Sequence, residues 1–102
     1  MPTMPDEYHA STGEDAALKR LLARAAEDDG EPIADFLLAW WNPQTCGNVV
    51  ISELWGHDAQ TTADFTTVFG LAIRSMSRPD SLGYESEFNA LLKLRRPHLK
   101  DD

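Results

Sequence analysis

The stretch IADFLLAWWNP, residues 33–43, constrains the fold most strongly, because it joins a complete helical stripe to a clear stop. Its large apolar residues recur at helical spacing, which is typical of one buried helix face: Ile33, Phe36, Leu37, Trp40 and Trp41. Pro43 disfavours helical geometry at the residue before it and ends the helix. Adjacent side chains on a helix point about 100° apart. We therefore expect Trp40 to lie largely inside the core and Trp41 partly, without stacking on each other.

The residues before this stretch predict a helix that begins near Ser11. Ser11 and Glu14 have the spacing of a capping box, in which the hydroxyl accepts from a helical amide and the carboxylate accepts from the cap amide. Small and large apolar side chains then follow at helical spacing as far as Ala25. Residues 1–10 contain two prolines and no such pattern. We expect a mobile N-terminal tail over residues 1–10 and a single helical domain over residues 11–102.

The longest predicted helix has Asp58 or Thr61 as its cap and stops before Pro79. We expect burial of its apolar face, which consists of Phe65, Val68, Phe69, Ala72, Ile73 and Met76. Gly70 interrupts this run at a cost of about 1 kcal/mol relative to alanine, which often signals close approach of another helix. A last helix carries its apolar face over Tyr84, Phe88, Leu91 and Leu92 and ends at Pro97.

The segment between residues 43 and 58 lacks helical periodicity. Val49–Ile51 is β-branched and favours extended chain, but a strand of three residues has no obvious partner. We expect this segment to cross the helices before Ser52 caps a single turn, with Trp55 buried in the core. The predicted fold class is all-α: a compact bundle of about four helices with an irregular extended crossing segment between helices 2 and 3.

Chain length limits how much apolar surface can be displayed. Ordering about a hundred residues costs on the order of 100–200 kcal/mol in conformational entropy, so a 102-residue domain must bury most of its large apolar side chains. The longest apolar run, Phe36–Trp41, is far shorter than the roughly 20 residues of a membrane span. The N-terminus lacks the features of a signal peptide, and one cysteine fits a reducing compartment. We expect a cytoplasmic protein without membrane association.

No residue spacing predicts catalysis, so we expect this chain not to be an enzyme. Cys46, His57 and Asp58 supply the residue types of a thiol triad. However, adjacent side chains such as His57 and Asp58 seldom align in that relay, and a lone cysteine in a turn is usually inert. One cysteine and three scattered histidines match no zinc spacing, and six dispersed glycines form no phosphate-binding loop. We expect no catalytic residue, no metal and no cofactor.

The formal net charge of -8 argues against nucleic acid as a partner, because such binding depends on neutralising phosphates with Lys and Arg. Acidic residues gather in the first third and basic residues near the C-terminus, a polarity that can steer a protein partner. We expect partner contacts at acidic, aromatic and basic positions: Asp28, Asp29, Glu31, Trp41, Asp58, Arg95 and Arg96. A solvated acidic surface that favours solubility is the simpler explanation of the charge.

Two questions stay open. A DNA-associated regulator would use the basic C-terminal segment, with Lys93, Arg95, Arg96 and Lys100 contacting phosphates. The oligomeric state is also open, because spare apolar residues such as Leu82 and Leu99 could close a dimer.

Four segments resemble a family of uncharacterised domains encoded on integrative elements, plasmids and prophages of proteobacteria: DFLLAWWNPQTCG, LWGHD, TVFGLAIRS and PDSLGYESEFNALLKLRRPHL. The resemblance covers residues 33–99, and its most specific segments are Trp-Trp-Asn, Leu-Trp-Gly-x-Asp and Arg-Pro-His-Leu. Family members tend to have Gly-Gly-Phe-Asp-Leu in place of residues 47–51, and a tryptophan in place of Leu94. The resemblance implies no activity. It implies an accessory factor that binds a host or element-encoded protein, including a counter-defence factor that covers a basic host-protein surface.

Overall fold

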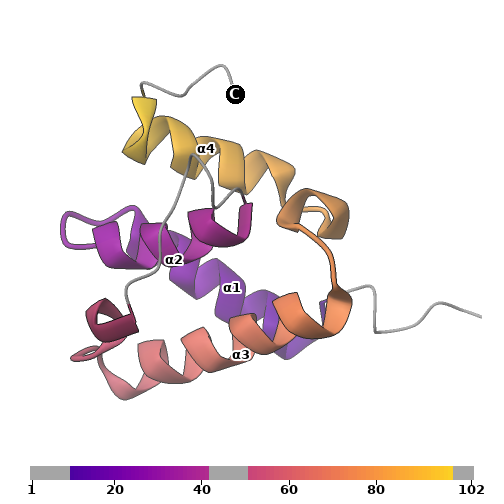
Figure 1. The fold of residues 1–102 in the computed structure, drawn as a ribbon, viewed down its shortest axis with the longest axis horizontal. Helices are drawn as coiled ribbons and strands as arrows, with labels where there is room; N and C mark the ends of the chain where they lie inside the picture. The colour runs from indigo at the N-terminus through magenta and orange to yellow at the C-terminus, as the bar shows by residue number, and fades with distance from the viewer. Residues whose placement is uncertain (1–9, 42–50, 98–102) are drawn as a thin grey trace, which may run out of the picture.

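The structure is a computed structural model that describes residues 10–41 and 51–97. Within these ranges the chain forms six helical elements: α1 (Thr12–Ala25), α2 (Glu31–Trp41), the short 3₁₀ helix η2 (Ile51–Leu54), α3 (Ala59–Ser75), the short 3₁₀ helix η3 (Pro79–Leu82) and α4 (Glu85–Arg95). The helix α1 packs against both α2 and α3, and α4 packs against α2 and also contacts α1 (Figure 1). The predicted all-α bundle is confirmed. Residues 42–50 of the expected crossing segment lie outside the described residues.

The start of α1 follows the sequence prediction closely. The Ser11 hydroxyl accepts from the Glu14 amide at 3.2 Å, and the Glu14 carboxylate accepts from the Ser11 amide at 2.9 Å. Two backbone amides that would otherwise lack a helical partner are thereby satisfied, so the helix begins at this point. Ala10, the last residue of the predicted tail, packs against the core, and residues 1–9 lie outside the described part.

The turn between α1 and α2 depends on Gly30. Its amide donates to the Glu27 carbonyl at 2.9 Å, and its carbonyl accepts from Ala34 at 2.9 Å, inside α2. A Cβ at this position would lie 2.7 Å from the carbonyl carbon and oxygen of Ala25, and closer still to the Arg24 carbonyl oxygen. Glycine therefore permits a backbone-to-backbone approach that lets α2 fold back onto α1.

The core lies where the inner faces of the helices meet. The inner face of α2 includes Ile33 and Leu37 of the predicted stripe, but Ala34 and Leu38 complete it, and the three aromatic residues of the stripe are only half-buried. The last helix buries the predicted side chains. The fully buried apolar residues of α1, α2 and α4 are Ala17, Leu18, Leu21, Ala25, Ile33, Ala34, Leu37, Leu38, Phe88, Leu91 and Leu92. Leu82, which the sequence left open for a dimer, is half-buried against this core.

The tryptophan pair at the end of α2 encloses one aromatic ring. Trp40 meets Phe88 edge-on, with ring centroids 5.9 Å apart and planes at 89°, and Trp41 stacks on Phe88 at 5.7 Å and 11°. Both indoles are half-buried, so Trp40 lies less deep than the sequence predicted. Its ring nitrogen donates to the Ser77 carbonyl at 2.8 Å, which ties the end of α2 to the chain after α3.

The predicted burial of the apolar face of α3 is wrong for half of that face. Phe69, Ile73 and Met76 are 58%, 61% and 80% exposed. The helix instead turns inward a face that mixes polar and apolar side chains: Thr61, Asp64, Phe65, Val68, Leu71 and Ser75.

The reason for this orientation lies on α1. Arg20 binds the buried carboxylate of Asp64 through two hydrogen bonds, from Nε at 2.9 Å and from a terminal nitrogen at 2.8 Å. One turn further along, Arg24 donates to the Thr61 hydroxyl at 2.8 Å. A buried carboxylate without such partners would carry a large desolvation penalty. The two arginines therefore fix which face of α3 points inward.

The predicted burial of Trp55 is also wrong, since its side chain is 72% exposed. The Trp55 amide donates to the Ser52 carbonyl at 3.2 Å, which closes a turn at the end of η2. Leu54 is the side chain of this turn that packs against the core. The chain then passes through Gly56, whose φ of 84° is left-handed, before Asp58 begins α3. The tight turn thus places Leu54 inward and Trp55 outward.

Candidate functional site

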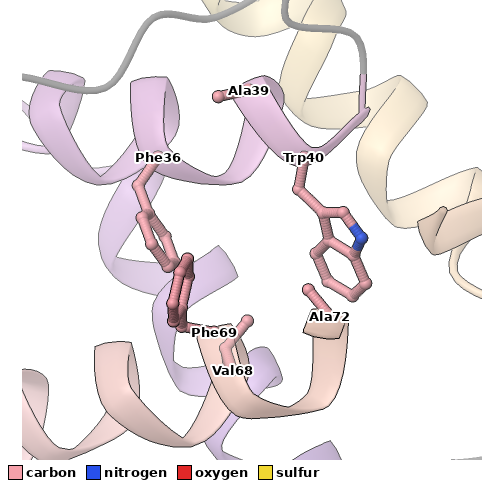
Figure 2. Close-up of a pocket in the computed structure, with 6 residues that line it drawn as sticks. All are labelled: Phe36, Ala39, Trp40, Val68, Phe69 and Ala72. Atoms are coloured by element: carbon pink, nitrogen blue, oxygen red, sulfur yellow. The ribbon is translucent and has the colours of Figure 1, made fainter. Parts of the chain in front are cut away.

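A groove lies between α2 and α3 on the face of the molecule that these helices share. Its volume is about 220 Å³, and we call it the α2–α3 groove; its lining residues are Phe36, Ala39, Trp40, Val68, Phe69 and Ala72. Figure 2 shows the rings of Phe36 and Phe69 facing one another at one end, with Trp40 above Ala72 at the other. Because α2 and α3 each pack against α1, the space between them is left for these side chains to line.

The chemistry of the groove is almost entirely apolar. Its lining side chains carry a single polar atom, the ring nitrogen of Trp40, and that nitrogen already donates to the Ser77 carbonyl. Phe36 is held by an edge-on contact with the Phe65 ring, with centroids 5.1 Å apart and planes at 71°. The groove therefore presents a preformed apolar surface without a side-chain donor or acceptor left to pair, which suits apolar recognition rather than acid-base chemistry.

An exposed apolar ridge borders the groove. Phe69, Ile73 and Met76 follow one another at helical spacing on the outer surface of α3, and we call these three residues the α3 ridge. Phe69 belongs to both the ridge and the groove. A groove continuous with an exposed apolar ridge is the kind of patch that marks an interaction site.

Gly70 lies beside this ridge and is exposed. Apart from its chain neighbours and its own helix backbone, a Cβ at Gly70 would meet no heavy atom within 4 Å in the described structure. The close helix approach that the sequence predicted at Gly70 is therefore not made within the described part of the chain.

Most of the sequence-predicted partner residues lie at or beside the turn between α1 and α2. Asp28 and Asp29 are exposed in the turn between α1 and α2. Trp41 packs on Phe88, away from that turn, and Asp58 lies at the start of α3. The structure therefore brings Glu31, Arg95 and Arg96 together beside Asp28 and Asp29, and it leaves Trp41 outside this group.

Arg95 and Arg96 hold α4 against the turn between α1 and α2. Arg95 donates from Nε to the Ala25 carbonyl at 3.0 Å and also to the Glu27 carbonyl. Arg96 donates to Glu31 at 2.8 Å. It also pairs with Asp35 of α2. Both arginine side chains are more than four-fifths covered, so their charges are used within the fold.

Asp58 caps α3, as one of the two sequence alternatives predicted. Its carboxylate accepts from the Thr61 amide at 3.2 Å and lies 3.5 Å from Arg24. Hydrogen bonds from the side chain and backbone of Thr61 hold the pKa of Asp58 below its usual value. This carboxylate is therefore ionised at neutral pH, and it caps the N-terminus of α3, where the helix dipole favours a negative charge.

The groups considered for catalysis do not form a described site. The His57 ring lies edge-on to Phe65, with centroids 5.4 Å apart, and Asp58 is the α3 cap; Cys46 lies outside the described residues. Over residues 10–41 and 51–97, no cluster of three or more His, Cys, Asp or Glu side chains could hold a metal ion. Helices formed by these residues are also too short or too polar to cross a membrane.

Sequence reasoning missed the α2–α3 groove, although one signal for it was present. The residues from Phe65 to Ile73 include no charge on any side of the helix, so the pattern permits two rival inner faces. A stripe through Thr61, Asp64, Val68 and Ser75 also has helical spacing. Choosing between the two faces requires knowing that Arg20 and Arg24 of α1 lie against Asp64 and Thr61 of α3.

Over the described residues, the chain is a small all-α domain with one core and an exposed apolar surface at the α2–α3 groove and the α3 ridge. Residues 15–96 match the sequence model of a family of unknown function, DUF7673, and the chain belongs to that family. This span includes every residue of the α2–α3 groove and the α3 ridge. No curated protein and no solved structure matches the chain. The predicted membership of a family without known activity is thus confirmed.

Proposed function

We propose that this chain is a non-catalytic protein-binding domain whose binding site is the α2–α3 groove together with the α3 ridge. The observation that carries the proposal is the exposure of Phe69, Ile73 and Met76 beside an apolar groove. Fully burying one such side chain stabilises a protein by about 1.5–3 kcal/mol. A domain of this size has a typical stability of only about 5–15 kcal/mol. Three large apolar side chains left outside are therefore explained better by binding than by folding.

Two further residues on this face are poor choices for folding alone. Gly70 costs about 1 kcal/mol relative to alanine in a helix, and its Cβ position is open in the described structure. Met76 ends α3 with φ 53° and ψ 34°, the left-handed conformation that helix ends usually assign to glycine. Its side chain is nonetheless large, apolar and exposed. Both residues are accounted for by a partner that contacts this surface.

The specific form of the proposal is an accessory factor of a bacterial mobile element that binds a host or element-encoded protein in the cytoplasm. A counter-defence factor that covers a basic host-protein surface is one such function. Its support is the net charge of -8, the exposed Asp28 and Asp29, and the family resemblance of the sequence. Complementary charge of this kind accelerates association more than it strengthens the final complex.

The DNA-associated regulator has less support. Its basic segment includes Arg95 and Arg96, and both guanidinium groups are engaged by carboxylates and carbonyls within the fold. Phosphate contacts would require these internal hydrogen bonds to be exchanged, which reduces the gain in binding.

The test places a photoreactive residue, p-benzoylphenylalanine, at Ile73 of the full chain. A matched control carries the same residue at Leu94, which is 55% exposed on α4 and lines a separate groove between α1 and α4. Irradiation in a lysate of a proteobacterial host that expresses the chain should give protein adducts at position 73 that position 94 does not give. Equal labelling at both positions, or no adduct with any protein chain at position 73, would refute the proposal.

A further inference from the structure

We infer that the partner that fills the α2–α3 groove is the α3 ridge of a second copy of this chain. The inference rests on the proposed function, because it names the occupant of that same site. It predicts a two-fold symmetric dimer in which α3 crosses α3 near Gly70.

The chemistry of the groove requires a helical occupant. An extended peptide brings unpaired backbone N–H and C=O groups, and each of these is costly to bury without a partner. The groove side chains offer no donor or acceptor to pair with them, since the Trp40 nitrogen is already bonded to Ser77. An α-helix satisfies its own backbone internally and presents only side chains to the groove.

The α3 ridge has the properties that such a helix needs. Phe69, Ile73 and Met76 stand at positions i, i+4 and i+7, and all three are more than half exposed. A cavity of roughly 150 Å³ can accept a benzene molecule, so a groove of about 220 Å³ has room for a large apolar side chain. Because Phe69 borders both surfaces, one two-fold axis can place each ridge in the groove of the other copy. Such an isologous contact closes after two copies.

Gly70 supplies the space for the crossing. Small residues at a crossing point allow two helix backbones to approach closely, whereas a side chain there would hold them apart. Within the described chain a Cβ at this position would meet nothing within 4 Å apart from its immediate helix surroundings. The helix that approaches Gly70 closely, as the sequence predicted, is therefore α3 of the second copy.

The distribution of charge favours a second copy over a basic partner at this surface. No residue from Phe65 to Ile73 is charged, and Asp64 is turned inward to Arg20. Arg74, which lies between Ile73 and Met76, is paired with Glu14. A basic partner would need acidic side chains beside the groove, whereas an identical apolar surface needs none. The net charge of -8 on each copy then gives only long-range repulsion, which added salt screens.

The available surface is enough for a weak dimer. The ridge and the groove together offer on the order of 500 Å² per copy, which is about 1,000 Å² in total and the lower end for a specific interface. We therefore expect a dissociation constant on the order of 10–100 µM rather than nanomolar affinity.

The experiment is sedimentation equilibrium of the full chain from about 1 µM to about 1 mM, a range that brackets the expected affinity. The variants are Gly70→Leu, which fills the crossing point, and Ile73→Ser, which removes the centre of the ridge. Leu94→Ser on α4 is the matched control. Circular dichroism at each concentration confirms that the variants are folded. Gly70 and Ile73, the positions altered in what we call the two ridge variants, are both exposed.

We expect wild type and Leu94→Ser to dimerise equally, and each ridge variant to weaken dimerisation at least tenfold. Raising the salt concentration should leave the dimer unchanged or strengthen it, because screening reduces the repulsion between the copies. A wild type that stays monomeric throughout, or ridge variants that dimerise like wild type, overturns the inference. So does a tenfold loss of dimer in high salt.

The photoreactive residue at Ile73 separates the two proposals. In a mixture of isotope-labelled and unlabelled chain, adducts that join the two at α2 or α3 support the second copy. If a monomeric wild type forms adducts only with a different protein, the second-copy inference fails and the proposed function stands. If it forms adducts with no chain, both fail.

Discussion

Replacing Gly30 with alanine should destabilise the domain by about 1–3 kcal/mol, the usual cost of forcing extra atoms into a packed site. We expect the upper end of this range because the atoms in the way are backbone. The new Cβ would lie 2.7 Å from the carbonyl carbon and oxygen of Ala25 and would also overlap the Arg24 carbonyl oxygen. These atoms belong to the end of α1 and cannot rotate away as a flexible side chain can. Either α2 shifts relative to α1 or the hydrogen bonds that Gly30 makes there are weakened.

The same substitution at Gly70 should have the opposite sign. Alanine is favoured over glycine in a helix interior by about 0.5–1 kcal/mol, and the Cβ at Gly70 points into open space in the described structure. Two chemically identical changes should therefore differ by about 2–4 kcal/mol, with Gly70→Ala the more stable.

The assay for this pair is urea unfolding monitored by tryptophan fluorescence, since Trp40 and Trp41 both pack on Phe88. Measurements at about 1 µM keep the chain well below the concentration expected for dimerisation. The midpoints should shift in opposite directions while the slope with urea stays constant. A neutral Gly30→Ala would refute the close backbone approach at the turn. A destabilising Gly70→Ala would show that this face of α3 is packed within the monomer.

Three further stability changes follow from side-chain contacts and can be measured by the same unfolding assay. Asp64→Asn should cost about 1–2 kcal/mol, because it removes a carboxylate that accepts two hydrogen bonds from the half-exposed Arg20 side chain; an unchanged stability would mean that this contact does not hold α3 against α1. Trp40→Ala should cost about 3 kcal/mol, the lower end for a large aromatic residue, because the indole is half-buried against Phe88. Tyr84→Phe should cost about 1.5 kcal/mol by removing a hydrogen bond to a carboxylate. Burial raises the pKa of Tyr84 above its usual value of 10.0. The wild type should therefore lose stability as pH rises above about 10, where the unfolded chain ionises more readily than the folded one. An equal loss of stability in the Tyr84→Phe variant would contradict this cause.

The parts of the fold that could be predicted are those fixed by neighbouring residues. The capping box of Ser11 and Glu14 at the start of α1 and the Asp58 cap at the start of α3 each act within a few residues. Local rules of capping and periodicity therefore recover the order and the approximate ends of the helices.

The orientation of α3 could not be predicted in this way, because it depends on a contact between residues 44 positions apart, Arg20 and Asp64. Periodicity treats Asp64 as a residue for the outer face and Phe69 as a residue for the core. The paired arginine reverses both assignments. The α2–α3 groove depends on that reversal, so it was not visible in the sequence.

The role of the basic C-terminus was obscured for a similar reason. Arg95 and Arg96 appear in the sequence as a surplus of positive charge at one end of the chain. In the fold they neutralise Glu31 and Asp35 and bind carbonyls at the end of α1. Charge separated along the sequence therefore became charge paired in space, and the polarity expected to steer a partner is partly cancelled.

The pairing of Arg20 with Asp64 also bears on why the α3 ridge stays outside. Burying an ion pair gives little net stability compared with apolar side chains of similar volume, whereas burying the ridge would be favourable. A rotation of α3 that brought Phe69 and Ile73 inward would carry Asp64 to the surface and break its two hydrogen bonds with Arg20. It would also remove the side chains of Phe65, Val68 and Leu71 from the buried face of α3. The ion pair and these buried apolar side chains together therefore favour the orientation that keeps the ridge on the surface. A chain optimised only for its own stability has no need of such a constraint, whereas a chain that must present an apolar helix to a partner does.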